Sequence, residues 1–401
     1  MISPHIPVAL LLLGLSLKPA PNDKLDRKAR AIHARILTLD THADAPINLQ
    51  KDGFDIGITH DVKKGGTQID FPRMKQGGMD AMFFAVYMAQ GPRTPEGHER
   101  AKEKALDIFE RIHAALRKHP TMAELATSPA DAYRIEKLGR RAVFIGMENG
   151  YPVGEDLAML KTYYDLGCRY ITLSHFANNA ICDSATDPDG PLHNGLSAFG
   201  KQVVAEMNRL GMMIDVSHVS DKTFYDVLAL SKAPVIASHS NARTLCAFPR
   251  NMTDQMIKDL AAKGGGIQIN FVSDYLRKPS DEHRQALNSV RMAGIGKVLT
   301  PEAEARLEAK TDSIKRVYAH ERASIADIVN HIDHVVKLVG INHVGIGSDF
   351  DGGGAVNGLE DVSEIENLTR ELLRRGYSEA DITKIWGGNL LRVLAQAKVV
   401  D

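Results

Sequence analysis

Short apolar segments recur along the chain and alternate with segments of helical periodicity. The apolar segments are nearly continuous, which is typical of strands that are buried on both faces of a parallel sheet. Repeated strand and helix units of this kind predict an α/β fold, a (β/α)8 barrel of the TIM type. We expect its eight strands within residues 36–39, 78–87, 141–148, 169–175, 211–218, 233–239, 265–271 and 343–349.

Two segments depart from this alternation. Residues 46–74 are rich in Gly, Lys and Asp without sustained periodicity, which predicts a long loop. Residues 276–322 form a charged stretch between the seventh and eighth strands, which we interpret as a helical insertion that serves as a lid or a dimer element. The remaining pattern predicts one domain over residues 22–401. Its helices are expected within residues 22–35, 99–118, 129–138, 155–166, 196–210, 222–230, 254–263, 324–339, 362–375 and 379–396.

Acidic residues and histidines stand at the carboxyl ends of the predicted strands. Barrels of this type place their chemistry at that rim, so residues far apart in the sequence would meet there. Random placement would put many of them on helices instead, so their shared position is stronger evidence for a site than any single motif. The residues at the strand ends are His42, Asp44, Glu148, His175, His218, His239 and Asp349.

Five of these side chains form a consistent set of metal ligands. Alternation along a strand directs His42 and Asp44 to the same face, where both can reach one divalent cation. His218 and His239 would hold a second cation, and Glu148 can offer one oxygen to each. A two-metal site converts bridging water into hydroxide near neutral pH and polarises a carbonyl or phosphoryl oxygen. Each histidine alone is better explained as a hydrogen-bonded core residue, whereas the five together favour metal.

Three further residues complete the predicted site. His175 exceeds the five-ligand set, so we assign it to substrate as a donor to the developing oxyanion. Asp349 suits a proton shuttle to a leaving amine, and the competing interpretation is a structural cap of the glycine-rich turn at 351–354. Arg250 follows the sixth strand by a short loop and could clamp a substrate carboxylate, although a lone arginine is usually a surface residue.

Composition and charge exclude several functional classes. The 401 residues carry a net charge of −1, with 44% hydrophobic and 25% charged residues, as in ordinary globular proteins. Without a positive field to attract a polyanion, we expect no nucleic-acid partner. The sequence has no Gly-x-Ser-x-Gly nucleophile elbow and no Gly-x-Gly-x-x-Gly turn after a strand. Its three cysteines are too few and too scattered for a disulfide framework or a cysteine zinc cluster.

The first residues resemble an export signal. An apolar run at residues 6–17 is too short to span a bilayer comfortably, so we expect no integral membrane span. No Lys or Arg precedes the run, and no clean cleavage site follows it. We interpret residues 1–21 as a leader and expect a periplasmic or secreted protein, with a cytoplasmic location as the alternative.

Several longer motifs are similar to those of the membrane dipeptidase (renal dipeptidase) family of zinc metallopeptidases, which are barrels of the amidohydrolase type. The resemblance runs from about Ile36 to Val393. It is carried by Asp40-Thr41-His42-Ala43-Asp44, Gly146-Met147-Glu148-Asn149-Gly150, Thr172-Leu173-Ser174-His175, Ile214-Asp215-Val216-Ser217-His218, Ser238-His239-Ser240, Pro249-Arg250-Asn251 and Gly345-Ile346-Gly347-Ser348-Asp349-Phe350-Asp351-Gly352.

This resemblance implies a function and a set of roles. It implies a binuclear zinc peptidase that cleaves dipeptides, often with a D-residue at the C-terminal side, and that is usually a homodimer. It implies two Zn²⁺ per chain, with Glu148 as the bridge and the other four ligands divided as above. It also assigns His175 and Arg250 to substrate, Asp349 to proton transfer, and adds Tyr275 as a substrate contact.

Two alternatives to a dipeptidase stay open. The same metal machinery could serve a β-lactam, a lactone or an N-acyl amino acid, because the insertion at 276–322 looks longer than in mammalian members. The second alternative is a non-catalytic or tailoring barrel that only binds metal or a peptide-like ligand.

Overall fold

The computed structural model describes residues 23–294 and 300–398, so the predicted leader at 1–21 lies outside the described residues. Its central feature is a ring of eight parallel strands, each hydrogen-bonded to the next. A parallel bridge between Ala43 and Phe350 joins the first strand to the last, and the amide of Asp44 donates to the carbonyl of Phe350 at 2.8 Å. This arrangement confirms the (β/α)8 prediction. The strands are β1 (Leu39–Ala43), β2 (Ala81–Tyr87), β4 (Arg141–Glu148), β5 (Cys168–Thr172), β6 (Met213–Asp215), β7 (Ile236–Ser240), β8 (Gly266–Ile269) and β9 (Val344–Ile346).

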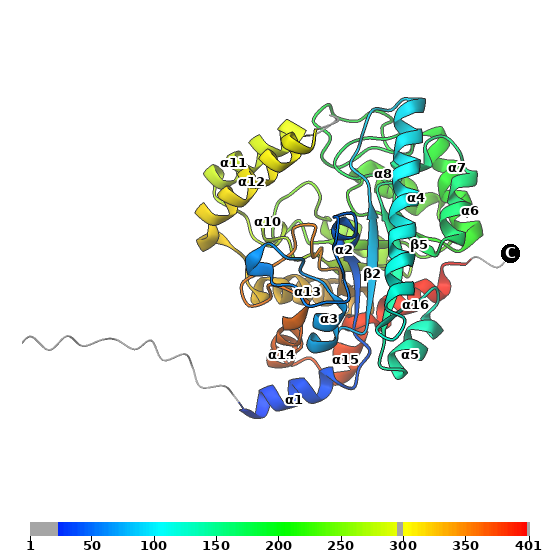
Figure 1. Ribbon diagram of the computed structural model, residues 1–401. Helices are drawn as coiled ribbons and strands as arrows, with labels where there is room; N and C mark the ends of the chain where they lie inside the picture. Colours follow the sequence, from blue (N-terminus) through cyan, green and yellow to red (C-terminus); the bar gives the residue numbers. More distant parts are fainter. Residues whose placement is uncertain (1–22, 295–299, 399–401) are drawn as a thin grey trace, which may run out of the picture.

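Helices surround this ring (Figure 1). Several of them begin at capping side chains: Ser197, for example, accepts the amide of Gly200, and Ser220 accepts that of Thr223. None of the helices within the described ranges is long and apolar enough to cross a membrane. The helices around the ring are α1 (Asp23–His33), α4 (Pro95–Lys118), α5 (Pro129–Lys137), α6 (Ala158–Asp165), α7 (Ala198–Leu210), α8 (Asp221–Leu230), α9 (Asp254–Ala262), α13 (Ile325–Val339), α14 (Glu366–Arg374), α15 (Glu379–Thr383) and α16 (Asn389–Gln396).

The insertion between β8 and β9 is helical, as expected. It contains α10 (Ser273–Leu276), α11 (Asp281–Gly294) and α12 (Pro301–Val317). Figure 1 shows α11 and α12 side by side at the periphery of the barrel. Hydrogen bonds hold the start of α11 against the residues that follow α12. The Glu321 carboxylate accepts the amide of Ser280 at 2.9 Å and lies 3.1 Å from the Nδ1 of His283.

The structure differs from the sequence expectations in three places: the loop at 46–74 and the unbroken helix at 379–396 were wrong, and one short strand was not anticipated. The predicted loop at 46–74 contains α2 (Ala45–Leu49) and α3 (Phe71–Gly77), each with a proline in its first turn and too short to show periodicity. A three-residue strand, β3 (Ala123–Leu125), pairs with β4 outside the ring. The single helix expected at 379–396 is interrupted at Gly387, whose φ of 156° is not helical.

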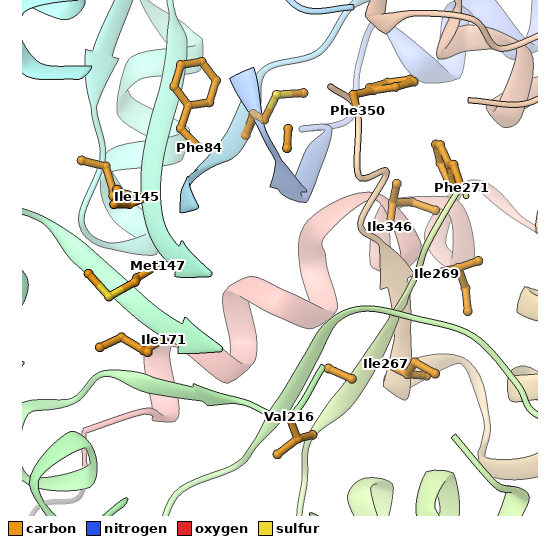
Figure 2. Close-up of a cluster of buried hydrophobic side chains, with 14 of the residues drawn as sticks. Phe84, Ile145, Met147, Ile171, Val216, Ile267, Ile269, Phe271, Ile346 and Phe350 are labelled. Carbon is orange, nitrogen blue, oxygen red and sulfur yellow. The ribbon is translucent and has the colours of Figure 1, made fainter. Parts of the chain in front are cut away.

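Two hydrophobic clusters support the strands from opposite sides. One lies between the ring and the helices, and Figure 2 shows members of it, from Phe84 and Ile145 to Ile346 and Phe350, arranged around the strands. The other contains the alternate strand positions, including Phe83, Phe144 and Tyr170. The Phe83 ring centroid lies 4.7 Å from that of Phe144 and 5.2 Å from that of Tyr170. Apolar side chains therefore fill the barrel beneath its carboxyl rim.

Candidate active site

The carboxyl ends of the strands bring the predicted ligands together. Glu148 is the last residue of β4, His42 lies in β1 and His239 in β7, while His218 follows β6 by a short turn. All are buried. His218 has a positive φ of 67°, an uncommon backbone conformation for a residue other than glycine.

Glu148 lies at the centre of this cluster. Its Oε1 is 3.1 Å from the Nε2 of His218 and 3.2 Å from the Nε2 of His239. Its other oxygen, Oε2, is 3.5 Å from the Nε2 of His42. The Nε2 atoms of His218 and His239 are only 2.9 Å apart. One carboxylate thus presents each of its oxygens to a different imidazole group, which is the arrangement that a shared ligand of two cations requires.

Asp44 and Asp349 extend the cluster beyond His42. The Oδ2 of Asp44 is 3.7 Å from the Nε2 of His42. Possible ligand atoms lie within 4.8 Å of one another in three groups of buried residues. His175 is in one of them, with its Nε2 3.6 Å from the Oε1 of Glu148, so its assignment to substrate stays a prediction. The groups are His42, Glu148 and His239; Glu148, His175 and His218; and His42, Asp44 and Asp349.

The electrostatics of the cluster favour an ionised Glu148 carboxylate beside neutral imidazoles at His218 and His239. Burial would lower the pKa of His42, but the neighbouring Tyr170 and Glu148 raise it well above its ordinary value. Burial would raise the pKa of Glu148, but the charges of His42 and His175 outweigh it and hold that pKa well below its usual range. Burial lowers the pKa of His218 and His239 well below the ordinary value for histidine. Deprotonated carboxylate and neutral imidazole are the forms that bind a metal ion.

The other two carboxyl groups, Asp44 and Asp349, are buried close to Glu148. Burial, with the charge of Glu148, raises the pKa of Asp44 to about 8, and burial also raises that of Asp349. The buried Asp44 Oδ1 and His42 Nε2 have no hydrogen-bond partner within the described part of the chain. Oxygen and imidazole donors that need a partner suit zinc and similar divalent cations. The residues present therefore fit a metal site.

Asp349 directs its side chain into the site. Its carboxylate accepts a hydrogen bond from the side-chain amide of Asn270 at 2.8 Å. The glycine-rich turn is closed by the backbone carbonyl of Asp349, which accepts the amides of Gly352 and Gly354 at 3.1 and 2.7 Å. The backbone of Asp349, rather than its carboxylate, therefore accepts these two amides of the turn, and its role in proton transfer stays a prediction.

Arg250 is buried beside the cluster, so its interpretation as a surface residue is also wrong. Its Nη2 lies 3.0 Å from the Nε2 of His218, and its Nη1 is 3.1 Å from the Oγ of Ser240. The guanidinium carbon is 5.2 Å from the ring centroid of Tyr275, so α10 supplies one face of the arginine's surroundings.

A cavity of about 230 Å³ opens onto these groups. Sequence reasoning missed several of its wall residues, including Tyr87, whose ring meets that of His175 edge-on with centroids 5.1 Å apart. Tyr87 ends the predicted strand at 78–87, and that position could have identified it. The lining residues are Asp44, Ile47, Tyr87, Glu148, His175, Phe176, His218, Val272, Tyr275, Asp349, Asp351 and Gly352.

Tyr170 is a second missed residue, and it orients His42. The Tyr170 hydroxyl lies 3.1 Å from the carbonyl of Thr41, to which it donates, and 2.8 Å from the Nδ1 of His42. Because the phenol has one hydrogen, it accepts the Nδ1–H of His42 and leaves Nε2 directed at Glu148. Alternation along β5 indicates which face Tyr170 occupies, but the sequence does not indicate its partner.

A family model and curated relatives identify the same protein family. Residues 26–401 match the family model described as membrane dipeptidase (peptidase family M19). The chain is 34% identical over 346 residues to "Dipeptidase aclJ" of Aspergillus oryzae, a match that covers 85% of this chain and 72% of that protein. It is 33% identical over 389 residues to "Uncharacterized dipeptidase C965.12" of Schizosaccharomyces pombe, covering 92% and 82% of the two chains.

Solved structures give the same result. The probable dipeptidase PvdM from Pseudomonas aeruginosa is similar with a TM-score of 0.83 and 32% identity, covering 94% of this chain and 99% of that one. A metallopeptidase from Rhodobacter sphaeroides, liganded with a phosphinate mimic of the dipeptide L-Ala-D-Ala, has a TM-score of 0.73 and 25% identity, covering 90% and 99%.

Proposed function

The chain belongs to the membrane dipeptidase family (peptidase family M19) of metallopeptidase hydrolases, as its motifs predicted, and from this membership we propose that it is a binuclear zinc dipeptidase. The observation that carries the proposal is the position of Glu148, whose two oxygens face His42 on one side and His218 with His239 on the other. His42 and Asp44 would hold one zinc ion, His218 and His239 the other, and Glu148 both. Bound there, the metal pair would supply an activated water and polarise the scissile carbonyl.

The remaining residues bind and orient the substrate or move a proton. Arg250 can clamp the free carboxylate of a dipeptide with its planar fork of donors. Tyr275 packs on the guanidinium and keeps it directed at the cavity. His175, in the cavity wall, donates a hydrogen bond to the developing oxyanion. Asp349, held by Asn270, accepts a proton and returns it to the leaving amine.

The small volume of the cavity supports a short substrate. A volume of about 230 Å³ leaves little room beyond two residues. We propose that a D-residue is accepted at the C-terminal position, in keeping with the phosphinate mimic of L-Ala-D-Ala bound by the neighbour from Rhodobacter sphaeroides. Dipeptides of both chiralities should distinguish this preference.

Two further proposals concern the cellular location and the oligomeric state of the protein. We propose export through the leader at 1–21, which N-terminal sequencing of protein recovered from the periplasm or medium would test. We also propose a homodimer, for which light scattering should give twice the mass of the purified chain, which is 43.9 kDa when the leader is present. Cell fractions with full-length protein in the cytoplasm, or a monomer mass, would contradict them.

The function is tested by metal analysis together with a substrate panel. We expect two zinc ions per purified chain and turnover of dipeptides in preference to β-lactams, lactones and N-acyl amino acids. Faster turnover of one of those three classes would instead favour the related amidohydrolase. Full metal occupancy without turnover of any amide would favour a binding protein.

Glu148→Gln tests the proposed shared ligand. The amide keeps the side chain's shape but removes its charge, so both ions lose a ligand, and we expect most of the metal and at least ~100-fold of kcat to be lost. Elemental analysis and steady-state kinetics on the same preparation measure both. Retention of two ions and normal turnover would refute the assignment.

A further inference from the structure

His239 is held from behind by a buried chain of hydrogen bonds. Its Nδ1 lies 2.7 Å from the Oγ of Ser238, and that Oγ lies 2.6 Å from the Oδ2 of Asp215. All three residues are inaccessible to solvent. Asp215 ends β6 and Ser238 lies in β7, so the chain crosses from one barrel strand to the next beneath the proposed metal site.

The Asp215 carboxylate determines the direction of these bonds. Its Oδ1 accepts the amides of Ser217 and Ser238 at 3.0 and 2.8 Å, and its Oδ2 accepts the hydroxyls of Thr172 and Ser238. An ionised carboxylate only accepts hydrogen bonds, so the single hydroxyl hydrogen of Ser238 goes to Asp215. The Oγ of Ser238 must then accept from His239, which places the imidazole proton on Nδ1.

From this geometry we propose that Asp215, acting through Ser238, is a positioning residue that fixes His239 in the tautomer with its Nε2 lone pair directed at Glu148. The proposal rests on the metal-ligand role assigned to His239 above. An outer hydrogen bond of this kind orients a ligand and fixes its tautomer, and its loss typically costs 10–100-fold in metal affinity. Neither Asp215 nor Ser238 would touch the metal or the substrate.

The three proposed histidine ligands differ in the hydrogen-bond partner of their Nδ1 atoms. His42 has an equivalent partner in Tyr170, whereas the buried Nδ1 of His218 has no hydrogen-bond partner among the described residues. His218 is instead approached at Nε2 by Arg250. Of the proposed ligand pair His218 and His239, only His239 is thus oriented by a hydrogen bond at Nδ1 among the described residues. Loss of that bond should weaken the metal affinity of the site that the two histidines form.

Asp215→Asn provides the sharpest test. The amide keeps the carboxyl shape, and its oxygen can still accept the two backbone amides at the Oδ1 position. Its nitrogen, in place of Oδ2, would donate to the Oγ of Ser238, so the serine hydrogen would turn to His239. The imidazole proton would then move to Nε2, where it blocks ligation.

The tautomer is read directly from ¹⁵N-histidine NMR of metal-free protein. We expect His239, assigned by comparison with His239→Gln, to be protonated on Nδ1 in the unsubstituted protein and on Nε2 in Asp215→Asn. Titration calorimetry with Zn²⁺ should show at least one site weakened 10–100-fold in the variant. An unchanged tautomer in Asp215→Asn, or an Nε2–H in the unsubstituted protein, would overturn the proposal.

Matched variants distinguish the loss of His239 positioning from a general disturbance of the structure around Asp215. Thr172→Val removes another hydroxyl from the same carboxylate oxygen without touching Ser238, so the tautomer and zinc affinity should stay unchanged. Ser238→Ala should lose the preference for Nδ1–H, and Ser238→Thr, which keeps a hydroxyl, should restore it. If Asp215→Asn does not fold, the comparison of Ser238→Ala with Ser238→Thr decides, and equal zinc affinities in those two would refute the relay.

Different results would contradict the positioning role of Asp215 and the proposed function. A chain that binds no zinc would contradict the metallopeptidase assignment while the metal-free NMR spectrum still reports the hydrogen-bond chain. Conversely, full zinc affinity in Asp215→Asn would leave the enzyme assignment intact and remove only the role given to Asp215.

Discussion

Gly352 is a position where an added methyl group would collide directly with two acidic side chains of the site. A Cβ there would lie 2.0 Å from the Oδ2 of Asp44 and 2.2 Å from the Oδ1 of Asp349. Both oxygens would have to move. We expect Gly352→Ala to lose at least ~10-fold in kcat/KM and part of its metal, because misplaced groups forfeit catalytic orientation.

The control for Gly352→Ala is Gly388→Ala, remote from the cavity. Gly388 has a helical φ of −55°, and its Cβ would lie 3.2 Å from the nearest atom, the carbonyl oxygen of Thr383. We expect normal kinetics and metal content for this variant. Normal kinetics for Gly352→Ala as well would show that the two carboxylates can shift without consequence.

His331 gives the molecule a dependence of stability on pH. Its Nδ1 accepts the amide of Ala242 and its Nε2 lies 3.0 Å from the carbonyl of Leu276, so it bonds as a neutral ring. Burial lowers its pKa from 6.5 to about 4. Since the folded pKa lies below the unfolded one, the stabilisation is complete above pH 6.5 and is lost as the pH falls towards 4, by at most about 3 kcal/mol.

The comparison of His331→Gln with the unsubstituted protein tests this dependence. Urea unfolding at pH 7 and pH 5 should show a smaller loss of unfolding free energy in the variant, because glutamine does not titrate. His320→Gln, at an exposed position, should leave the loss unchanged. An equal loss in His331→Gln and the unsubstituted protein would assign the acid sensitivity to other groups.

At the scale of elements, the cap of α8 links helix stability to the loop that carries His218. Ser220 accepts the amide of Thr223 at 3.1 Å, and its own amide donates to the carbonyl of Asp183. We expect Ser220→Ala to lower the unfolding free energy by about 1 kcal/mol, measured in urea. Ser220→Asn keeps an acceptor and should restore most of it, and equal stability of the two variants would argue against the cap.

The elements that sequence reasoning identified are those with a long-range signature. The eight barrel strands could be predicted because strands covered on both sides are nearly continuous apolar runs, as β4 is between Arg141 and Glu148. Once the barrel is assumed, its rim brings Glu148 and the histidines together without further information. Short helices such as α2 and the break at Gly387 depend on local packing that periodicity does not record. Side-chain partnerships such as Tyr170 with His42 depend on distances across the barrel, which no spacing in the sequence encodes.

At the scale of the whole molecule, the proposed ligands tie distant strands together. His42 and Glu148 lie in β1 and β4, and His218 and His239 lie beyond β6 and in β7. A cation that binds only the folded chain stabilises it in proportion to the logarithm of its concentration over Kd. We therefore expect chelation to lower the melting temperature by at least ~5 °C, and added Zn²⁺ to restore it.

Glu148→Gln is the matched comparison for chelation. Because it should already lack most of the metal, its melting temperature should respond little to the chelator. Differential scanning calorimetry measures both proteins. A large chelator effect that persists in Glu148→Gln would place the stabilising cation outside the proposed site.

The closure of the barrel has a consequence for how the enzyme is made. The first strand, which carries His42, is braced by the residues that follow β9, through the bridge between Ala43 and Phe350 and the bond from the Asp349 amide to the His42 carbonyl at 3.0 Å. During translation, all five proposed ligands leave the ribosome well before those bracing residues. A nascent chain therefore contains every proposed metal ligand early, but it cannot become a working enzyme until its last strand has emerged beside its first.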